Sequence, residues 1–234
     1  MVLGNSRKVS SNQIGLHLSL EEVVLRHIRH ESRTPIAGHS QKAFEESLGL
    51  IVENREKLVL DSGCGTGEST ISIAKQFPEL FVIGFDKSLS RLSSFEQKTD
   101  AVERPSNLHL IRADAVHFWR LLKEKNIKLQ KHYLLYPNPW PKKKHLQRRW
   151  HGSSSLPDIL SLGGKLELKS NWKLYLEEFK RACEIASTIQ EYSQMLVGEI
   201  ERIEPGEQGF PISLFEKKYH ESGQDLYKLT IELA

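Results

Sequence analysis

Cysteine is scarce in this chain. Only Cys64 and Cys183 occur among 234 residues, and they lie far apart. Two separated cysteines support neither a disulfide framework nor a zinc site, so we expect no metal and a reducing, cytoplasmic setting. No apolar run approaches the roughly 20 residues that a membrane-spanning helix needs. The first residues, Met1 to Lys8, also lack the apolar segment of a signal peptide, so we expect no membrane partner.

A strong net charge is also missing. The chain has 33 Lys and Arg against 30 Asp and Glu, a formal net charge of +3. It is therefore no polycation, and any contact with nucleic acid must come from local clustering of charge. Hydrophobic residues make up 38% and charged residues 27%, as in a soluble folded protein. The length allows one large α/β domain or two small ones.

Strands and helices are expected to alternate from about residue 40 onward. Short apolar runs predict strands at 57–60, 80–85, 108–111, 132–136, 165–168, 192–197 and 225–233. Helical spacing predicts helices at 20–28, 40–54, 67–77, 89–98, 115–125, 158–162 and 172–186. This order favours a Rossmann-like, doubly wound α/β fold with a mostly parallel seven-stranded sheet and an antiparallel edge strand. We expect residues 1–35 to form a polar, mobile arm, either solvated or in contact with RNA, before one domain over 36–234.

The segment from Leu58 to Thr70 has the order strand, glycine loop, helix start. Gly63, Gly65 and Gly67 permit a sharp turn and a close approach of the backbone to a ligand. The next helix offers unpaired N–H groups there. The spacing Gly-x-Gly-x-Gly differs from the Gly-x-Gly-x-x-Gly fingerprint of dinucleotide enzymes. It favours S-adenosylmethionine (SAM) as cofactor and methyl transfer over hydride transfer.

Carboxylates follow three successive predicted strands: Asp61, Asp86 and Asp114. The carboxyl ends of parallel strands meet in the crevice where such sheets bind ligands. Asp86 would suit a ribose diol, Asp114 an adenine amino group, and Asp61 a sulfonium or amino group. Each alone is an ordinary candidate for a helix N-cap, but the three together favour a cofactor pocket.

The segment Tyr136-Pro-Asn-Pro-Trp-Pro-Lys-Lys-Lys-His145 follows a predicted strand. Its prolines restrict Asn138, and a fixed amide beside an aromatic ring and dense positive charge suits a base on a phosphate chain. We predict a phosphate-binding cluster, flanked by Trp140 and Trp150, of Lys142, Lys143, Lys144, His145, Arg148 and Arg149. The alternative is a solvated loop with two partly buried tryptophans.

Together these segments resemble the bacterial tRNA (guanine-N7)-methyltransferase family. The resemblance runs from about residue 40 to the end and includes Ser170-Asn-Trp172 and Ser213-Leu-Phe-Glu216. It implies a single Rossmann-like domain that binds SAM and methylates N7 of the variable-loop guanosine of tRNA. It implies SAM contacts at Asp61, Asp86 and Asp114, and guanine or tRNA contacts at Lys142, Asn171, Ser213, Phe215 and Glu216.

Three sites depart from the family pattern. The family typically has Asp where this chain has Asn138 and Asn171, and Thr-Lys where it has Ser213-Leu214. Guanine N7 carries a free lone pair, so the reaction needs orientation and no general base. We therefore predict Asn138 as the catalytic residue, beside both cofactor and base, with its carbonyl accepting a hydrogen bond from guanine.

Two alternatives remain open. Asn-Pro-Trp also resembles the Asn-Pro-Pro-aromatic motif of amino-methyltransferases, which would direct the methyl group to another RNA base or an exocyclic amine. A tRNA-binding paralogue without turnover is the second alternative. We expect tRNA as the partner and a monomer or homodimer.

Overall fold

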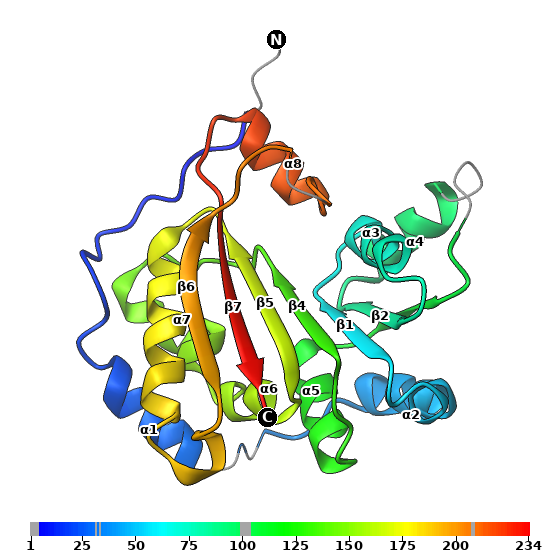
Figure 1. The fold of residues 1–234 in the computed structure, drawn as a ribbon, viewed down its shortest axis with the longest axis horizontal. Helices are drawn as coiled ribbons and strands as arrows, with labels where there is room; N and C mark the ends of the chain where they lie inside the picture. The colour runs from blue at the N-terminus through cyan, green and yellow to red at the C-terminus, as the bar shows by residue number, and fades with distance from the viewer. Residues whose placement is uncertain (1–4, 31, 33, 99–103, 207–208) are drawn as a thin grey trace.

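The computed structural model describes residues 5–30, 32, 34–98, 104–206 and 209–234. Its centre is a seven-stranded sheet in the order β3-β2-β1-β4-β5-β7-β6 (Figure 1). The strands are β1 Leu58–Ser62, β2 Phe81–Asp86, β3 Leu108–Arg112, β4 Lys131–Leu135, β5 Gly164–Ser170, β6 Leu196–Arg202 and β7 Tyr227–Leu233. Strands β1 to β5 are parallel, and β7 runs antiparallel to both β5 and β6.

Helices cover both faces of the sheet. They are α1 Leu20–Arg29, α2 Gly38–Glu53, α3 Glu68–Gln76, α4 Leu89–Lys98, α5 Ala115–Glu124, α6 Leu156–Ser161, α7 Lys173–Ala186 and α8 Leu214–Glu221. Leu58 and Leu60 pack into one core with α1, α2, α5, α6 and α7, whereas Val59 packs with α3 on the other face. Strand β1 is therefore apolar at successive positions, as a strand covered on both faces must be.

The predicted fold class is confirmed, and each predicted strand and helix has a counterpart. The last two strands form the expected antiparallel pair at one edge, with β6 outermost. The strand predicted at 192–197 is shifted, because Gln190–Tyr192 form a 3-10 turn that buries Tyr192, and β6 begins at Leu196. Helix α8 was not predicted.

The N-terminal arm contains the helix predicted at 20–28, and residues before it are hydrogen-bonded to the domain, while its mobility stays a prediction. Helix α1 lies against α7 and buries Leu20, Val23 and Val24. Gln13, before the helix, is 8% exposed and is hydrogen-bonded inside the protein. The arm is thus attached to the domain at Ser6 and Gln13, although most residues between them are exposed, as the polar composition indicated. The domain boundary at residue 36 stays a prediction.

Candidate functional site

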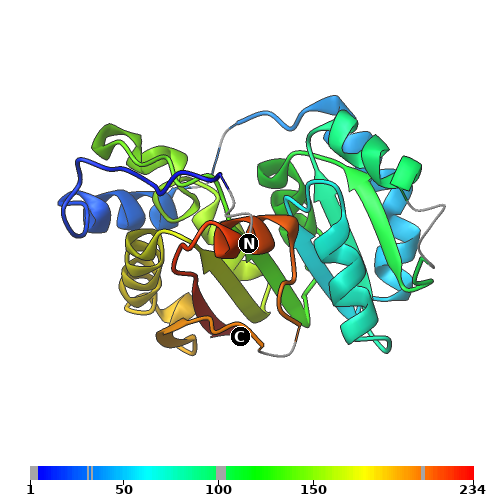
Figure 2. The ribbon, with the colours of Figure 1, turned by 90° about the horizontal axis from the view of Figure 1, so that it is seen from above.

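A cavity of about 710 Å³ opens at the carboxyl edge of β1, β2 and β4. Its wall combines Gly63 after β1, Asp86 at the end of β2, the segment 136–140 after β4, and Phe215 of α8. A smaller cavity of about 260 Å³ adjoins it and shares Gly63 and Phe215. Figure 2, seen from above, shows α8 lying over this edge. The combined space suits a nucleotide-sized ligand.

The glycine loop leaves its backbone open to this space. Gly63, Gly65 and Gly67 have φ of +78°, +63° and +83°, values that L side chains rarely adopt. A Cβ atom built at Gly63 or Gly65 would meet no heavy atom within 4 Å. The N–H groups of Gly63 and Cys64 donate to the carbonyl of Phe85, which fixes the turn against β2. The loop is therefore rigid where a ligand approaches it.

Asp61 lies in β1 just before the loop, is 1% exposed and lines neither cavity. Its Oδ2 accepts hydrogen bonds from Ser69 Oγ at 2.6 Å and Thr70 Oγ1 at 2.7 Å. Its Oδ1 is buried without a hydrogen-bond partner. Burial raises the pKa of Asp61 to about 6, against the two hydroxyl donors and with help from the charge of Asp86. A buried oxygen that lacks a donor favours a cationic or N–H group of a ligand nearby.

Asp86 ends β2 on the wall of the larger cavity. Its carboxylate accepts from the N–H groups of Gly65 at 3.1 Å and Ser88 at 2.8 Å, and Arg91 Nη1 lies 3.3 Å away. These bonds hold the carboxylate and the glycine loop in one geometry. Arg91 lines both cavities but carried no sequence signal that marked it.

Asp114 lies between β3 and α5. It is the N-cap of α5, and its Oδ1 accepts from the N–H of Val116 at 3.1 Å. It does not line either cavity. The structure shows its capping role, and an adenine contact at Asp114 stays a prediction.

Asn138 is exposed on the wall of the larger cavity. Its Oδ1 accepts from the N–H of Trp140 at 3.2 Å, which closes a local turn. Tyr136 and Trp140 have φ of 52° and 44°, so the backbone on both sides of Asn138 is unusual for L residues. The guanidinium of Arg148 lies 4.8 Å from the centre of the Trp140 ring. The predicted amide, an aromatic ring and a cation thus meet at one opening.

Helix α8 and its N-cap supply the third part of the candidate site, a wall of both cavities. Ser213 is its N-cap and accepts from the N–H of Glu216, a pairing that the spacing Ser-x-x-Glu could have indicated. Ser213 and Phe215 line the smaller cavity. Glu216 is fully buried behind this wall, where its carboxylate receives bonds from Tyr136 and Lys169. A substrate contact at Ser213, Phe215 or Glu216 stays a prediction.

Two predicted substrate residues lie outside this cavity. Lys142 is exposed and lines a separate groove near residues 10–17. Asn171 donates from Nδ2 to Oε1 of Gln224 at 2.8 Å. Their contacts with tRNA stay predictions.

The predicted phosphate-binding cluster needs one correction. Arg149 is 0% exposed and forms an ion pair with the equally buried Glu178, so it cannot meet a phosphate. Lys142, Lys143, Lys144 and Arg148 are exposed. His145 is partly buried, and phosphate binding by the cluster stays a prediction. The partner of Arg149 lies 29 residues away and left no local signal.

Within the described residues, no group of three His, Cys, Asp or Glu side chains is placed to hold a metal ion. In that same part of the chain, no helix is both long and apolar enough to span a membrane.

Comparison with known proteins identifies a sequence family. A family model described as "Putative methyltransferase" matches residues 55–229. A tRNA (guanine-N(7)-)-methyltransferase of Pseudoalteromonas translucida is 26% identical over 209 residues, 85% of this chain and 80% of that protein. The enzyme of that name from Salmonella typhi is 25% identical, over 86% of this chain and 83% of its own. That from Thermotoga maritima is 29% identical, but the match covers 55% of this chain and 41% of that protein.

Solved structures share the fold at lower identity. The 16S rRNA methyltransferase KamB has a TM-score of 0.59 and 18% identity, over 86% of this chain and 95% of that one. An antibiotic-related methyltransferase has a TM-score of 0.57 and 16% identity, over 85% of this chain and 96% of that one. Both support a Rossmann-like methyltransferase sheet.

Proposed function

This chain belongs to the methyltransferase family whose model matches residues 55–229, and we propose that it transfers a methyl group from SAM to N7 of a guanine in tRNA. One observation carries the proposal. Gly63 of the glycine loop, Asp86, Asn138 and Trp140 line a single cavity at the carboxyl edge of the sheet. The relatives from Pseudoalteromonas translucida and Salmonella typhi, which align over most of both chains, bear the name of this activity.

The residues at this edge fit SAM. The unpartnered Oδ1 of Asp61 suits a positive group, and the carboxylate of Asp86 on the cavity wall suits ribose hydroxyls. The backbone at Gly63 and Gly65 has room beside it for a closely packed ligand, while Gly67 completes the turn. When bound, SAM supplies an electrophilic methyl group. We also propose that Asp114 contacts adenine. Its carboxylate would make this contact while it still accepts the N-cap hydrogen bond from the N–H of Val116.

The base would lie at the other end of the cavity, between aromatic rings. Trp140 and Phe215 both line it and are partly exposed, so each offers a face for stacking. Asn138 keeps its side chain at the opening because Oδ1 is bonded to the N–H of Trp140. A carbonyl oxygen has a second lone pair, which can receive a guanine N–H. Because N7 already has a free lone pair, these residues need to orient the base and remove no proton.

The remaining parts of the proposal concern the substrate and the setting. Arg148 on the cavity wall and the exposed Lys142 to Lys144 of the separate groove suit the phosphates of tRNA. We propose the variable-loop guanosine as the target, with a monomer or homodimer acting in the cytoplasm. The buried, unpaired thiols of Cys64 and Cys183 are compatible with that setting.

The direct test is an incubation of the protein with methyl-labelled SAM and unmodified tRNA, followed by digestion to nucleosides. The proposal predicts label in N7-methylguanosine, mapped to the variable loop by chemical cleavage at that nucleoside. Label in another nucleoside would support a different RNA base or an exocyclic amine. Binding of tRNA without any label would support a paralogue that has lost turnover.

A further inference from the structure

Residues 6–17, here called the N-terminal strap, are tied to the domain at both ends. At the first end, the N–H of Ser6 donates to Ser222 Oγ at 3.1 Å, and Gln224 Nε2 donates to the carbonyl of Ser6 at 3.0 Å. Gln224 is the residue that also receives the amide of Asn171. Figure 1 shows the strap running from beside α8, past α7, to α1. Its start is therefore coupled to the end of β5.

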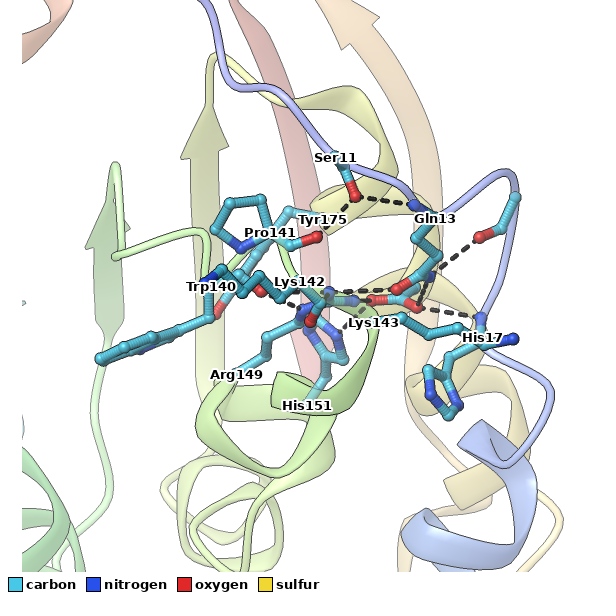
Figure 3. A network of polar contacts seen from close by, with 12 residues as sticks. Ser11, Gln13, His17, Trp140, Pro141, Lys142, Lys143, Arg149, His151 and Tyr175 are labelled. Atoms are coloured by element: carbon cyan, nitrogen blue, oxygen red, sulfur yellow. Dashed lines mark hydrogen bonds and ion pairs between the residues drawn. The ribbon is translucent and has the colours of Figure 1, made fainter.

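The second tie is a buried carboxylate. Glu178 Oε1 accepts from Gln13 Nε2 at 2.6 Å and from the N–H of His17 at 3.0 Å, while Oε2 pairs with Arg149 and His151 (Figure 3). Arg149 Nη2 also donates to Gln13 Oε1 at 3.1 Å, so Gln13 bridges both charges. Burial opposes ionisation of Glu178, but the contact with His151, the charge of Arg149 and the hydrogen bond from Gln13 lower its pKa to about 2. Glu178 therefore accepts these hydrogen bonds as a carboxylate.

The same arginine fixes the loop that carries the lysines. Arg149 Nε and Nη2 donate to the carbonyl of Trp140 at 3.3 and 3.1 Å. The strap touches that loop directly, since Ser11 Oγ donates to the carbonyl of Pro141 at 2.5 Å (Figure 3). One buried ion pair thus sets the position of both the strap and the segment beside the cavity.

Between strap and loop lies a groove of about 740 Å³. It is lined by Ser10, Ser11, Asn12 and His17 of the strap and by Pro141, Lys142, Lys143 and Lys144 of the loop. Hydroxyls, an amide, an imidazole and three exposed ammonium groups line it, and none of these lining residues is a carboxylate. The strap adds the exposed cations Arg7 and Lys8 just upstream. This chemistry matches the phosphates and sugar hydroxyls of an RNA backbone.

We propose that the groove binds the sugar-phosphate backbone of the tRNA substrate, so that the N-terminal strap is half of the RNA-binding surface. Gln13 and Glu178 are its positioning residues, because they hold the strap without facing the groove. The inference rests on the proposed function for the identity of the RNA. The sequence allowed two roles for this segment, a solvated tail or an RNA contact, and the proposal assigns it the second.

Two variants separate the effect of the strap's positive charge from the effect of its attachment to the domain. Arg7→Ala with Lys8→Ala removes two strap cations and leaves the Gln13 tie intact. Gln13→Leu keeps every cation but removes the two side-chain hydrogen bonds of Gln13, to Glu178 and from Arg149, and leaves only the N–H of His17 to join the strap to Glu178. The matched control is Lys57→Ala with Lys125→Ala, which removes two exposed lysines before β1 and after α5, at the opposite edge of the sheet.

The dissociation constant for unmodified tRNA is then measured by filter binding across a series of salt concentrations, and SAM affinity is measured in parallel. Each phosphate contact contributes about 0.7 to 0.9 to the slope of log affinity against log salt. The Arg7 and Lys8 variant should lower the slope by about one to two. Gln13→Leu should weaken tRNA binding about tenfold with unchanged SAM affinity, a loss equivalent to about 1.4 kcal/mol.

Strap variants that match the Lys57 and Lys125 control in affinity and slope would overturn the inference, as would an equal loss of SAM affinity, which signals general unfolding.

The outcome is distinguishable from failure of the proposed function. If the wild-type protein methylates guanine N7 while strap variants bind tRNA like the control, only the strap proposal fails. If tRNA binds through the strap but label appears in another nucleoside, only the guanine-N7 proposal fails. If the wild-type protein does not bind tRNA, both fail.

Discussion

The phenol of Tyr136 donates a 3.0 Å hydrogen bond to Oε1 of Glu216, a carboxylate with no exposed surface. The same oxygen receives Lys169 Nζ at 3.0 Å, and Oε2 accepts from the N–H of Ile212. Tyr136 begins the segment that carries Asn138, whereas Glu216 belongs to the helix that carries Phe215. This one carboxylate therefore fixes two walls of the cavity relative to each other.

Glu216→Gln should destabilise the fold and weaken substrate binding. The amide keeps the size of the side chain but leaves Lys169 without its closest buried counter-charge, a change that costs several kcal/mol in comparable sites. Glu167, 3.7 Å from Lys169, offsets part of the loss, so we expect about 2 kcal/mol in the free energy of unfolding by urea titration. The control is Glu221→Gln on the same helix, whose exposed pairing with Lys217 should contribute less than about 0.5 kcal/mol. Equal effects of the two variants would contradict the account.

Asp86→Asn should weaken SAM binding about tenfold or more. The substitution keeps the size of the side chain and an acceptor for the N–H of Gly65, but it removes the negative charge from the cavity wall. Hydrogen bonds to a charged group contribute about 1.5–3 kcal/mol, which corresponds to at least tenfold in affinity. Calorimetric titration with SAM measures the change, and Asp225→Asn, an exposed carboxylate before β7, is the control. An unaltered SAM affinity would remove Asp86 from the site.

Asp61 should make stability depend on pH in an uncommon direction. Its pKa is raised to about 6 in the folded state from an ordinary value of 3.8, so the folded protein binds more protons between these values. The contribution of Asp61 is therefore fully favourable below about pH 4 and is lost as the pH rises through about 6. Asp61→Asn should gain up to about 3 kcal/mol relative to the wild type across this window. Unfolding curves at pH 4 to 7 that stay parallel for the two proteins would show that the carboxyl is not perturbed.

Asn138 should contribute through its carbonyl oxygen and its position. Asn138→Ala removes both the turn bond to Trp140 and the proposed contact with the base, so we expect kcat to fall about 100-fold, as for other removed polar contacts in a transition state. Asn138→Asp keeps an acceptor for the N–H of Trp140 and adds a negative charge near the developing purine cation, so kcat should rise. Single-turnover methyl transfer measures the rates of both Asn138 variants beside the wild type. A lower rate with Asp than with Asn would show that the donor N–H of the amide is the needed group.

The sheet and the glycine loop at its carboxyl edge could be predicted because short stretches of sequence specify them. Each apolar run, the glycine spacing and the carboxylate after each of the first three predicted strands can be recognised within a few positions, as at Gly63, Gly65 and Asp86. Arg149 and Glu216 are buried against partners far along the chain, so no local sequence pattern could predict their burial. Gln13 is the clearest case, since a glutamine in a polar arm gives no sign that it is buried against Glu178, 165 residues away.

The central claim is that the cavity at the carboxyl edge performs methyl transfer to guanine N7 in tRNA. It is tested most directly by counting labelled N7-methylguanosine formed per enzyme on unmodified tRNA, for the wild type beside Asp86→Asn at a SAM concentration that saturates neither protein. The account predicts multiple turnovers into that nucleoside for the wild type and a sharp decrease for the variant. Radioactivity absent from N7-methylguanosine, or equal in both proteins, would contradict it.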